Sequence, residues 1–345
     1  MASQKEHQKK SSPKEVQIAP SVPMMTYRVC KSKNTKFLNY VRGYDGEYEI
    51  RQCSDCGAHF SSDPYSNPYK DYKTFYPLYL AQSEQIKKEP NPFQFLLNKE
   101  YCYLSVKEAI GNRTNLNILE VGCGYGYLTY TLRKMGHSVE GIDTAEEPII
   151  FAQENFGNNY HLMPVEDYNY KGEFDLVIAL GTVEHVFDVF SFLVSCKKLL
   201  NTNGKIVLTT PNKDFFPNGI WQTEKPPVHL SWLSRRTFEV LAKKLNMNIN
   251  FTDFKSFISK NERDNELEEY FKSRLPEAFS AQSFSRRFLQ AITPRNFYWL
   301  LPIGCFVLFL RNFDFKSIRY AHNLFYRKFL WRKESLTLGV IFTLK

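Results

Sequence analysis

The strongest constraint on the fold is an alternation of short apolar segments with helical segments between residues 96 and 255. The run Phe174–Leu180 is nearly all apolar, as a strand buried on both faces of a sheet should be. Such alternation indicates an α/β fold, a parallel sheet covered by helices on both faces. The expected elements are strand Asn117–Val121, helix Tyr127–Met135, strand Ser138–Asp143, a helix opening near Pro148, strand Phe174–Leu180, helix Val189–Leu200, strand Lys205–Thr210 after a turn at Asn203–Gly204, a helix capped by Ser234, and strands Asn246–Phe254 and Leu336–Leu344.

Composition divides the rest of the chain. Residues 1–23 are polar and rich in lysine, which predicts a disordered tail. Residues 24–95 are rich in Tyr, Pro and Asn and predict a small, turn-rich module followed by a connector. Residues 96–345 form the main domain, interrupted at 255–334 by a basic and aromatic segment that we expect to be a helical insertion.

The net charge of +9 is concentrated late in the chain, where ten Lys and Arg residues between 286 and 333 face one acidic residue, Asp314. Two interpretations of 283–333 stay open, a peripheral contact with an anionic membrane surface and a helical lid over the acceptor pocket. The apolar run 297–310 would extend only about 21 Å as a helix, too short to span a bilayer. Residues 1–20 hold no apolar run typical of a secretory signal. We therefore expect a cytoplasmic protein, peripheral at the inner membrane surface if 283–333 binds lipid.

A glycine-rich loop follows the first expected strand, with Gly122, Gly124 and Gly126 at alternate positions. Glycines there let the backbone turn sharply and let a ligand lie against it. Dinucleotide-binding loops space their glycines G-x-G-x-x-G, whereas this loop reads G-x-G-x-G and has Glu120 two positions ahead. A carboxylate at that position disfavours a pyrophosphate and favours a ligand that carries an ammonium group.

Three further elements follow later strands. Asp143 ends the second strand, where a carboxylate can accept hydrogen bonds from ribose hydroxyls. Val165 and Glu166 follow the third strand, where they could read the edge of an adenine, and Leu180 ends the fourth. Ligands of open α/β sheets bind outside the carboxyl ends of the strands, so we expect one site there.

Five segments together resemble the ordered motifs of class I S-adenosylmethionine-dependent methyltransferases, in particular the branch with ubiquinone-pathway O-methyltransferases and sugar methyltransferases. They read I-L-E-V-G-C-G-Y-G from 118, G-I-D from 141, F-D-L-V-I-A-L-G-T-V-E-H-V from 174, L-L-N-T-N-G-K-I-V-L-T-T-P-N from 199 and H-L-S-W-L-S from 229. The resemblance covers 115–254 and resumes at the last strand. It implies a Rossmann-like seven-stranded methyltransferase sheet with helices on both faces, and S-adenosylmethionine as cofactor.

The resemblance also implies a role for each residue of the cofactor site. The methionine portion would contact Glu120, Gly122, Gly124 and Gly126, the ribose would contact Asp143, and adenine would contact Val165 and Glu166. Leu180 would lie beside the sulfonium. We add Cys123, which lies within the glycine loop, and Thr144, which directly follows Asp143, to the predicted cofactor-binding residues. Pro164 departs from the family pattern, which often has a small or acidic residue there. For Cys123 a small packed side chain is expected rather than a nucleophile.

On the acceptor side, the candidates for catalysis are His185 and His229. Methyl transfer is an in-line displacement that depends mainly on positioning, and it needs a base only if the acceptor must lose a proton. The alternative for each residue is a buried histidine satisfied by backbone groups.

The N-terminal module resembles the zinc-ribbon segment that precedes the catalytic domain in many sugar methyltransferases. Cys53 and Cys56 match its second Cys-x-x-Cys knuckle, but the first has Tyr27 in place of a cysteine and keeps only Cys30. Structural zinc takes four ligands, so either His59 completes the site or the metal has been lost.

The sequence thus predicts transfer of a methyl group to a small-molecule acceptor, with a sugar or another glycan- or lipid-pathway metabolite as the leading expectation. The alternatives are a quinone-like phenol, a nucleic acid, and a catalytically silent relative that binds the cofactor. A nucleic-acid acceptor is disfavoured because no N-P-P-Y-like loop follows the fourth strand and no Pro-Cys nucleophile is present. The oligomeric state stays open.

Overall fold

The computed structural model describes residues 28–44, 46–62, 84–99, 102–169, 173–215, 220, 225–254 and 337–345. The predicted tail at 1–23, most of the predicted connector, and the insertion at 255–334 with its proposed membrane contact lie outside these residues. Within the described residues, no helix is long and apolar enough to cross a membrane.

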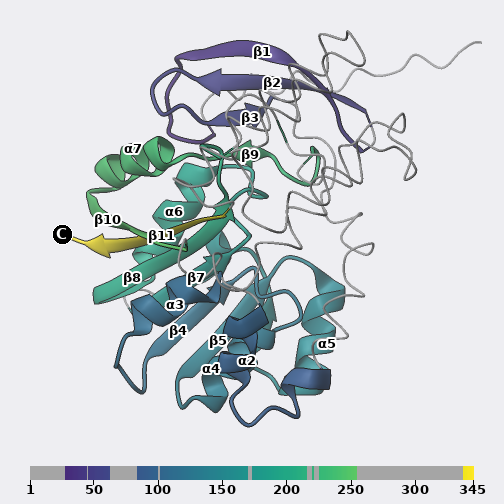
Figure 1. The fold of residues 1–345 in the computed structure, drawn as a ribbon, viewed down its shortest axis with the longest axis vertical. Helices are drawn as coiled ribbons and strands as arrows, with labels where there is room; N and C mark the ends of the chain where they lie inside the picture. The colour runs from purple at the N-terminus through teal and green to yellow at the C-terminus, as the bar shows by residue number, and fades with distance from the viewer. Residues whose placement is uncertain are drawn as a thin grey trace, which may run out of the picture.

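The main sheet has seven strands in the order β10-β11-β8-β7-β4-β5-β6 (Figure 1). The five strands from β6 to β8 are parallel to their neighbours, whereas β11 runs antiparallel between β8 and β10. This confirms the predicted Rossmann-like sheet of seven strands. The strands are β4 (Asn117–Val121), β5 (Ser138–Asp143), β6 (Tyr160–Leu162), β7 (Phe174–Leu180), β8 (Leu200–Pro211), β10 (Met247–Thr252) and β11 (Thr337–Leu344).

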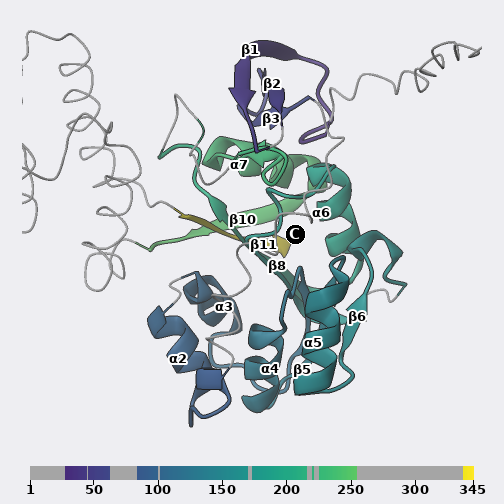
Figure 2. The same ribbon diagram turned by 90° about the vertical axis from the view of Figure 1, so that its right-hand side faces the viewer.

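Helices cover both faces of this sheet, as predicted (Figures 1 and 2). One face carries α2 (Pro92–Lys99), α3 (Tyr103–Ile110), α4 (Tyr127–Lys134) and α5 (Glu146–Phe156), and the other carries α6 (Val189–Lys198) and α7 (Arg235–Leu245). The β7 strand shows why both faces are filled, because Leu176 and Ile178 pack toward α3 and α4 while Val177 packs toward α6 and α7. A short 3₁₀ helix, η2 (Val165–Asp167), follows β6.

Local sequence signals place several boundaries. Ser234 caps α7 in a capping box with Thr237, as its position before an apolar helical pattern predicted. The predicted turn at Asn203–Gly204 is wrong, because both residues lie inside β8. The register of β8 on β7 shifts between Phe174 and Leu176, so β8 absorbs the extra residues as an irregularity. Gly204 is needed there because a Cβ would lie 2.8 Å from the carbonyl oxygen of Phe174.

The N-terminal module forms a second sheet, with strand order β1-β2-β3-β9 (Figure 1). Its strands are β1 (Thr35–Arg42), β2 (Glu47–Cys53), β3 (His59–Ser61) and β9 (Ser231–Trp232). The first three come from the predicted module, but β9 comes from the segment between β8 and α7 and pairs antiparallel with β3. The module is therefore completed by a strand of the main domain.

Candidate functional site

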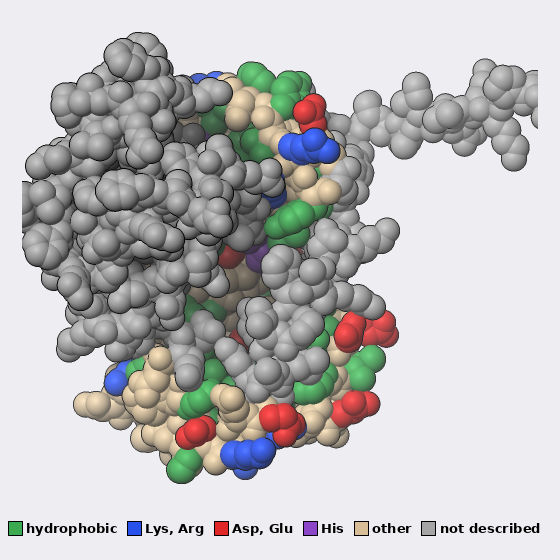
Figure 3. All heavy atoms as spheres, turned by 45° about the vertical axis from the view of Figure 1, so that its right-hand side comes forward, with side chains coloured by type: hydrophobic (Ala, Val, Ile, Leu, Met, Phe, Trp, Pro, Cys, Tyr) green, Lys and Arg blue, Asp and Glu red, His purple; other side chains and the backbone are tan. Residues whose placement is uncertain are grey.

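One cavity of about 960 Å³ opens at the carboxyl ends of the parallel strands. It is the hollow between the upper and lower parts of the molecule in Figure 3, where acidic and histidine atoms are visible. The structure brings almost every predicted site residue of the main domain to its wall. These are Glu120, Gly122, Cys123, Gly124, Asp143, Thr144, Val165, Glu166, Leu180, His185 and His229.

Gly126 is the predicted cofactor residue that does not line the cavity. Its φ is +78°, and a Cβ there would lie 2.3 Å from Cε1 of Tyr160, which packs behind the loop. Gly124 also has a positive φ, +51°, but a Cβ there would meet nothing within 4 Å. The loop therefore uses one glycine to pack against the domain and another to leave open space for a ligand.

Glu120 lies at the base of the loop and is only 6% exposed. Its Oε2 accepts hydrogen bonds from the backbone N–H of Thr129 at 2.8 Å and from the Thr129 hydroxyl at 2.6 Å. Burial raises the pKa of Glu120 to about 8, and the nearby Asp143 carboxylate adds to this. A cationic group in the cavity would stabilise the ionised form, so this environment fits the ammonium of an amino acid.

Asp143 binds the glycine loop from the neighbouring strand. Its Oδ2 accepts a hydrogen bond from the N–H of Gly124 at 2.8 Å, and its Oδ1 accepts one from the N–H of Ala145 at 2.9 Å. Each carboxylate oxygen can accept more than one hydrogen bond, so the group keeps capacity for two ligand hydroxyls. The structure thus explains how Asp143 can fix the loop and face the cavity at once.

Cys123 is buried in the loop, and burial raises the pKa of its thiol well above the usual value. A protonated, packed thiol is a poor nucleophile, in agreement with the expected packing role.

One end of the cavity is formed by η2 and by the start of α6. Val165 is buried and Glu166 stands beside it, as the sequence predicted, and Pro164 also lines the wall. Asp188 and Phe192, which sequence reasoning missed, complete this side. Asp188 is the N-cap of α6 and Phe192 lies in its first turn, so the position of α6 on the sheet brings them to the cavity.

At the other end, Glu184, His185 and His229 lie close together, each offering an atom within 4.8 Å of the other two. The two imidazole rings meet edge to face, with centroids 4.6 Å apart. Nδ1 of His185 lies 2.7 Å from the carbonyl oxygen of Val228. Because a carbonyl only accepts, Nδ1 donates, and the lone pair of His185 is on Nε2, 4.0 Å from Oε1 of Glu184.

Burial decides the protonation of these three groups. It lowers the pKa of His185 to about 4 and that of His229 well below its usual value, and it raises the pKa of Glu184 to about 7. Both histidines are therefore neutral at physiological pH. Glu184, which was not among the predicted catalytic residues, is the group whose pKa lies near neutrality and which suits proton transfer best.

Sequence reasoning missed other residues that line the cavity. Tyr103 comes from α3, Thr210 from the end of β8 and Thr337 from the start of β11. They are far apart in the chain and no local pattern marks them, because only the packing of three separate elements brings them to one wall.

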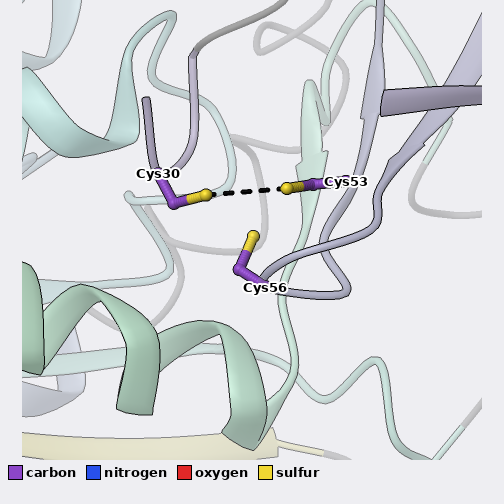
Figure 4. Close-up of side chains that lie close together, drawn as sticks. All are labelled: Cys30, Cys53 and Cys56. Carbon is purple, nitrogen blue, oxygen red and sulfur yellow. Dashed lines mark hydrogen bonds between the residues drawn. The ribbon is translucent and has the colours of Figure 1, made fainter. Parts of the chain in front are cut away.

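In the N-terminal module, Cys30, Cys53 and Cys56 form a buried cluster whose sulfurs lie within 4.8 Å of one another (Figure 4). The Cys30 and Cys53 sulfurs are 3.6 Å apart. Tetrahedral zinc with Zn–S bonds of about 2.3 Å would separate its sulfurs by roughly 3.8 Å, so the spacing fits. Hydrogen bonding from Cys56 lowers the pKa of Cys30 to about 6, which favours the thiolate that binds metals.

His59 is not brought into this cluster. Two groups of described residues lie close enough to hold a metal ion, the three cysteines and, in the cavity, Glu184 with His185 and His229, and His59 belongs to neither. His59 lies on β3 and is half-buried, and burial together with Lys213 and Lys36 lowers its pKa to about 3. The described residues thus supply three of the four ligands that structural zinc takes.

Comparison with known proteins identifies the main domain. Residues 96–250 match a family described as a methyltransferase domain. Residues 96–250 thus form a class I, S-adenosylmethionine-dependent methyltransferase domain. This agrees with the strand order and with the glycine loop of the cavity.

Among relatives of the methyltransferase domain, the ubiquinone biosynthesis O-methyltransferase of Bradyrhizobium diazoefficiens is 34% identical over 131 residues, which is 36% of this chain and 51% of the relative. The enzyme of the same name from Hydrogenovibrio crunogenus is 32% identical over 132 residues, with 36% and 51% covered. The chain thus spans about half the length of the curated relatives it matches. A solved S-adenosylmethionine-dependent methyltransferase from Aquifex aeolicus aligns with 20% identity and a TM-score of 0.37, over 49% of this chain and 91% of that one.

Proposed function

We propose that this protein transfers a methyl group from S-adenosylmethionine to a hydroxyl group of a small-molecule acceptor. The observation that carries the proposal is a single cavity with two chemically distinct ends. One end has the open glycine loop between Glu120 and Asp143, and the other has Glu184 beside two neutral histidines. This arrangement suits a nucleoside with an amino acid at one end and a group that loses a proton at the other.

In this proposal the loop residues bind and orient the cofactor. When bound, S-adenosylmethionine supplies an electrophilic methyl group on a sulfonium. Glu120 would pair with the ammonium and Asp143 with the ribose hydroxyls, which are the partners that their burial and free acceptor capacity favour. Val165 and Glu166 would contact the adenine, and Leu180 would lie near the reacting centre.

Glu184 is the residue best suited to accept the proton of the acceptor hydroxyl. Its Oε2 is buried and has no hydrogen-bond partner among the described residues, and its pKa near 7 matches the operating pH. His185 and His229, the sequence-based candidates, would position the acceptor as neutral imidazoles. If Glu184 accepts the hydroxyl proton, the acceptor oxygen becomes more nucleophilic toward the methyl group that the bound cofactor would supply, with S-adenosylhomocysteine as the leaving group.

We favour a phenolic acceptor over the sugar that the sequence first suggested. The acceptor end includes the apolar side chains Phe187, Val228 and Leu230, which suit a flat ring better than a polyhydroxylated one. The relatives reported above are named for O-methyl transfer in ubiquinone biosynthesis, which supports the same class. A sugar remains the second candidate because Thr182, Thr209 and Thr210 add hydroxyls to the wall.

Two measurements test this proposal. Calorimetry should detect binding of S-adenosylhomocysteine to the folded protein, and its absence would refute the cofactor assignment. Transfer of radiolabelled methyl should then be measured with 3,4-dihydroxybenzoate as a catechol probe and a nucleotide sugar as the alternative. Transfer to the nucleotide sugar alone would overturn the phenolic assignment.

The double variant His185→Gln/His229→Gln should lose at least about tenfold in turnover and keep its affinity for S-adenosylhomocysteine, because neither histidine belongs to the loop end of the cavity. His161→Gln is a matched control, since His161 lies on β6 and its Nε2 is 3.4 Å from Glu140 instead. Unchanged turnover in the double variant would exclude both histidines from the reaction.

We also propose that Cys30, Cys53 and Cys56 hold one zinc ion, with the fourth ligand supplied by water or by residues outside those described. The fit of the sulfur spacing and the burial of all three thiols support this. Elemental analysis should find about one equivalent of zinc in the unmodified protein. The zinc should be lost in Cys53→Ser and kept in Cys102→Ser, because Cys102 is the N-cap residue of α3 and does not belong to the cysteine cluster. Zinc well below one equivalent in the unmodified protein would mean that packing alone holds the module.

For the basic segment 283–333 we retain peripheral contact with an anionic membrane surface as a proposal based on sequence. Sedimentation with anionic vesicles tests it, and failure to bind would favour the lid.

A further inference from the structure

Arg28, in the turn before β1, is an arginine buried at the junction of the two sheets. It is 3% exposed, and its guanidinium carbon lies 5.6 Å from the ring centroid of Phe60 and 5.2 Å from that of Phe187. Burial lowers its pKa to about 10, against the effect of the nearby Asp188 carboxylate. The side chain is therefore a cation at neutral pH, held between two aromatic rings.

The hydrogen bonds of Arg28 join three separate segments. Its Nη2 donates to the carbonyl oxygens of Ser61, at the end of β3, and of Leu230, at 3.4 Å and just before β9. Its own carbonyl oxygen accepts a hydrogen bond from the N–H of Phe190 in α6, at 3.4 Å. Its Nε and Nη1 are buried with no hydrogen-bond partner among the described residues, so Nη2 makes both of these side-chain contacts.

Two of these segments carry the histidines of the acceptor end. Leu230 directly follows His229, and Phe187 lies two residues after His185. The backbone N–H groups of Leu230 and Ser231 both donate to the carbonyl oxygen of Glu184, at 2.9 and 3.1 Å. Nδ1 of His185 donates in turn to the carbonyl oxygen of Val228 at 2.7 Å. The segment of His185 and the segment of His229 are thus hydrogen-bonded to each other, and Arg28 contacts both.

We infer that Arg28 is a positioning residue, which holds the segment of His229 against the loop of His185 and so makes the N-terminal module part of the acceptor site. This rests on the proposed function, in which the two histidines orient the acceptor. Arg28 differs from Lys31, the other basic residue of this turn that lies near Asp188, because Arg28 is buried. Lys31 from the same turn also pairs with Asp188, but Lys31 is 39% exposed, and exposed ion pairs contribute little.

The readout is the tautomer of His185, observed by ¹⁵N NMR of the full-length protein labelled at its seven histidines. The signals of His185 and His229 are assigned with single His→Gln variants. In the unmodified protein His185 should show one fixed tautomer with the proton on Nδ1. In Arg28→Ala its nitrogen shifts should move toward the average of the two tautomers, while His137, whose Nδ1 accepts from the N–H of Leu116, should not change.

Two variants serve as comparisons. Arg51→Ala removes an arginine of the same sheet that pairs with Glu49, and it should leave every histidine signal unchanged. Arg28→Lys keeps the charge but loses the forked, planar group, so its His185 signal should lie between those of the unmodified protein and Arg28→Ala.

Unchanged His185 and His229 signals in folded Arg28→Ala would overturn the inference. So would failure of both Arg28 variants to fold while Arg51→Ala folds, because Arg28 would then serve stability alone. Calorimetry with S-adenosylhomocysteine is run on the same samples, and the affinity of Arg28→Ala should stay within about twofold of the unmodified protein, since no loop contact changes. If the unmodified protein binds no S-adenosylhomocysteine, the proposed function fails, and the NMR result still decides the role of Arg28.

Discussion

Replacing Gly124 or Gly126 by alanine should separate ligand binding from folding within one short loop. The two residues have φ angles of +51° and +78°, a left-handed region that costs an L-amino acid about 1–2 kcal/mol. This backbone cost is common to both substitutions. Any difference between them must come from what the new methyl group meets.

At Gly126 the methyl group would meet packed atoms. A Cβ would lie 2.3 Å from Cε1 of Tyr160 and 3.0 Å from Cβ of Ala152, and the Tyr160 hydroxyl donates to the Gly126 carbonyl at 3.0 Å. Tyr160 is fully buried and cannot swing away, so overpacking should add about 1–3 kcal/mol. The expected loss of unfolding free energy is about 2–5 kcal/mol for Gly126→Ala and about 1–2 kcal/mol for Gly124→Ala.

Ligand binding should follow the opposite order. Gly124 lines the cavity with nothing within 4 Å of its Cβ position, so alanine would place a methyl group in ligand space. We expect affinity for S-adenosylhomocysteine to fall at least about tenfold in Gly124→Ala, equivalent to about 1.4 kcal/mol. Gly126 does not line the cavity, so the folded Gly126→Ala protein should lose less affinity.

Urea unfolding followed by fluorescence gives the stabilities, and calorimetry on the folded proteins gives the affinities. Equal losses of stability in the two variants would refute the steric argument for Gly126. Unaltered affinity in Gly124→Ala would refute the placement of the cofactor on the loop.

Two further substitutions test the electrostatics and the capping of the domain. Because burial raises the pKa of Glu120 from 4.5 to about 8, the folded state keeps a proton that the unfolded chain releases, so the contribution of Glu120 to stability falls as the pH rises from about 5 to about 8. The stability of Glu120→Gln relative to the unmodified protein should therefore increase across that range in urea titrations, and a constant difference would contradict the buried, protonated carboxyl group. Ser234→Ala should lower the free energy of unfolding by about 1 kcal/mol, because the Ser234 hydroxyl accepts a hydrogen bond from the N–H of Thr237 at 3.2 Å. Ser234→Asp should recover most of this loss, because aspartate is also a good N-cap residue. Equal stability of the two variants would show that the cap contributes nothing.

Sequence analysis predicted the bounds of an element best where the local pattern of apolar residues agrees with the way the element packs in the fold. The bounds of β4 and β7 match the apolar runs Asn117–Val121 and Phe174–Leu180, because a central parallel strand must be apolar on both faces. The turn at Asn203–Gly204 failed because Asn-Gly signals a turn only when the strands around it end there. In the structure, β8 continues through both residues to pair with β7 and β11.

The candidate site was predictable wherever its residues directly follow strands. Asp143, Leu180 and His185 could be placed because the carboxyl ends of parallel strands converge at one edge. Tyr103 and Thr337 could not, since their positions depend on how α3 and β11 pack. The role of Glu184 also needed the structure, because its pKa depends on burial, which the sequence does not give.

The junction between the two sheets was not predicted from the sequence, again because it depends on contacts between distant segments. β9 has two residues, too few for a strand pattern, and its partner β3 lies about 170 residues earlier in the chain. The cysteine turn is also held by α7. Thr237 of α7 donates to the Cys56 carbonyl at 3.1 Å, and Arg236 donates to the Asp55 carbonyl at 2.9 Å.

These contacts fix the cysteine turn to α7, which packs against β10 and β11 of the main sheet. β9 begins two residues after His229 and pairs with the strand that follows the same turn. The pairing of β3 with β9 therefore connects the cysteine turn to the segment of His229. A perturbation of the thiols should therefore reach His229 through β3 and β9, whereas the glycine loop is held by Asp143 and Tyr160 instead.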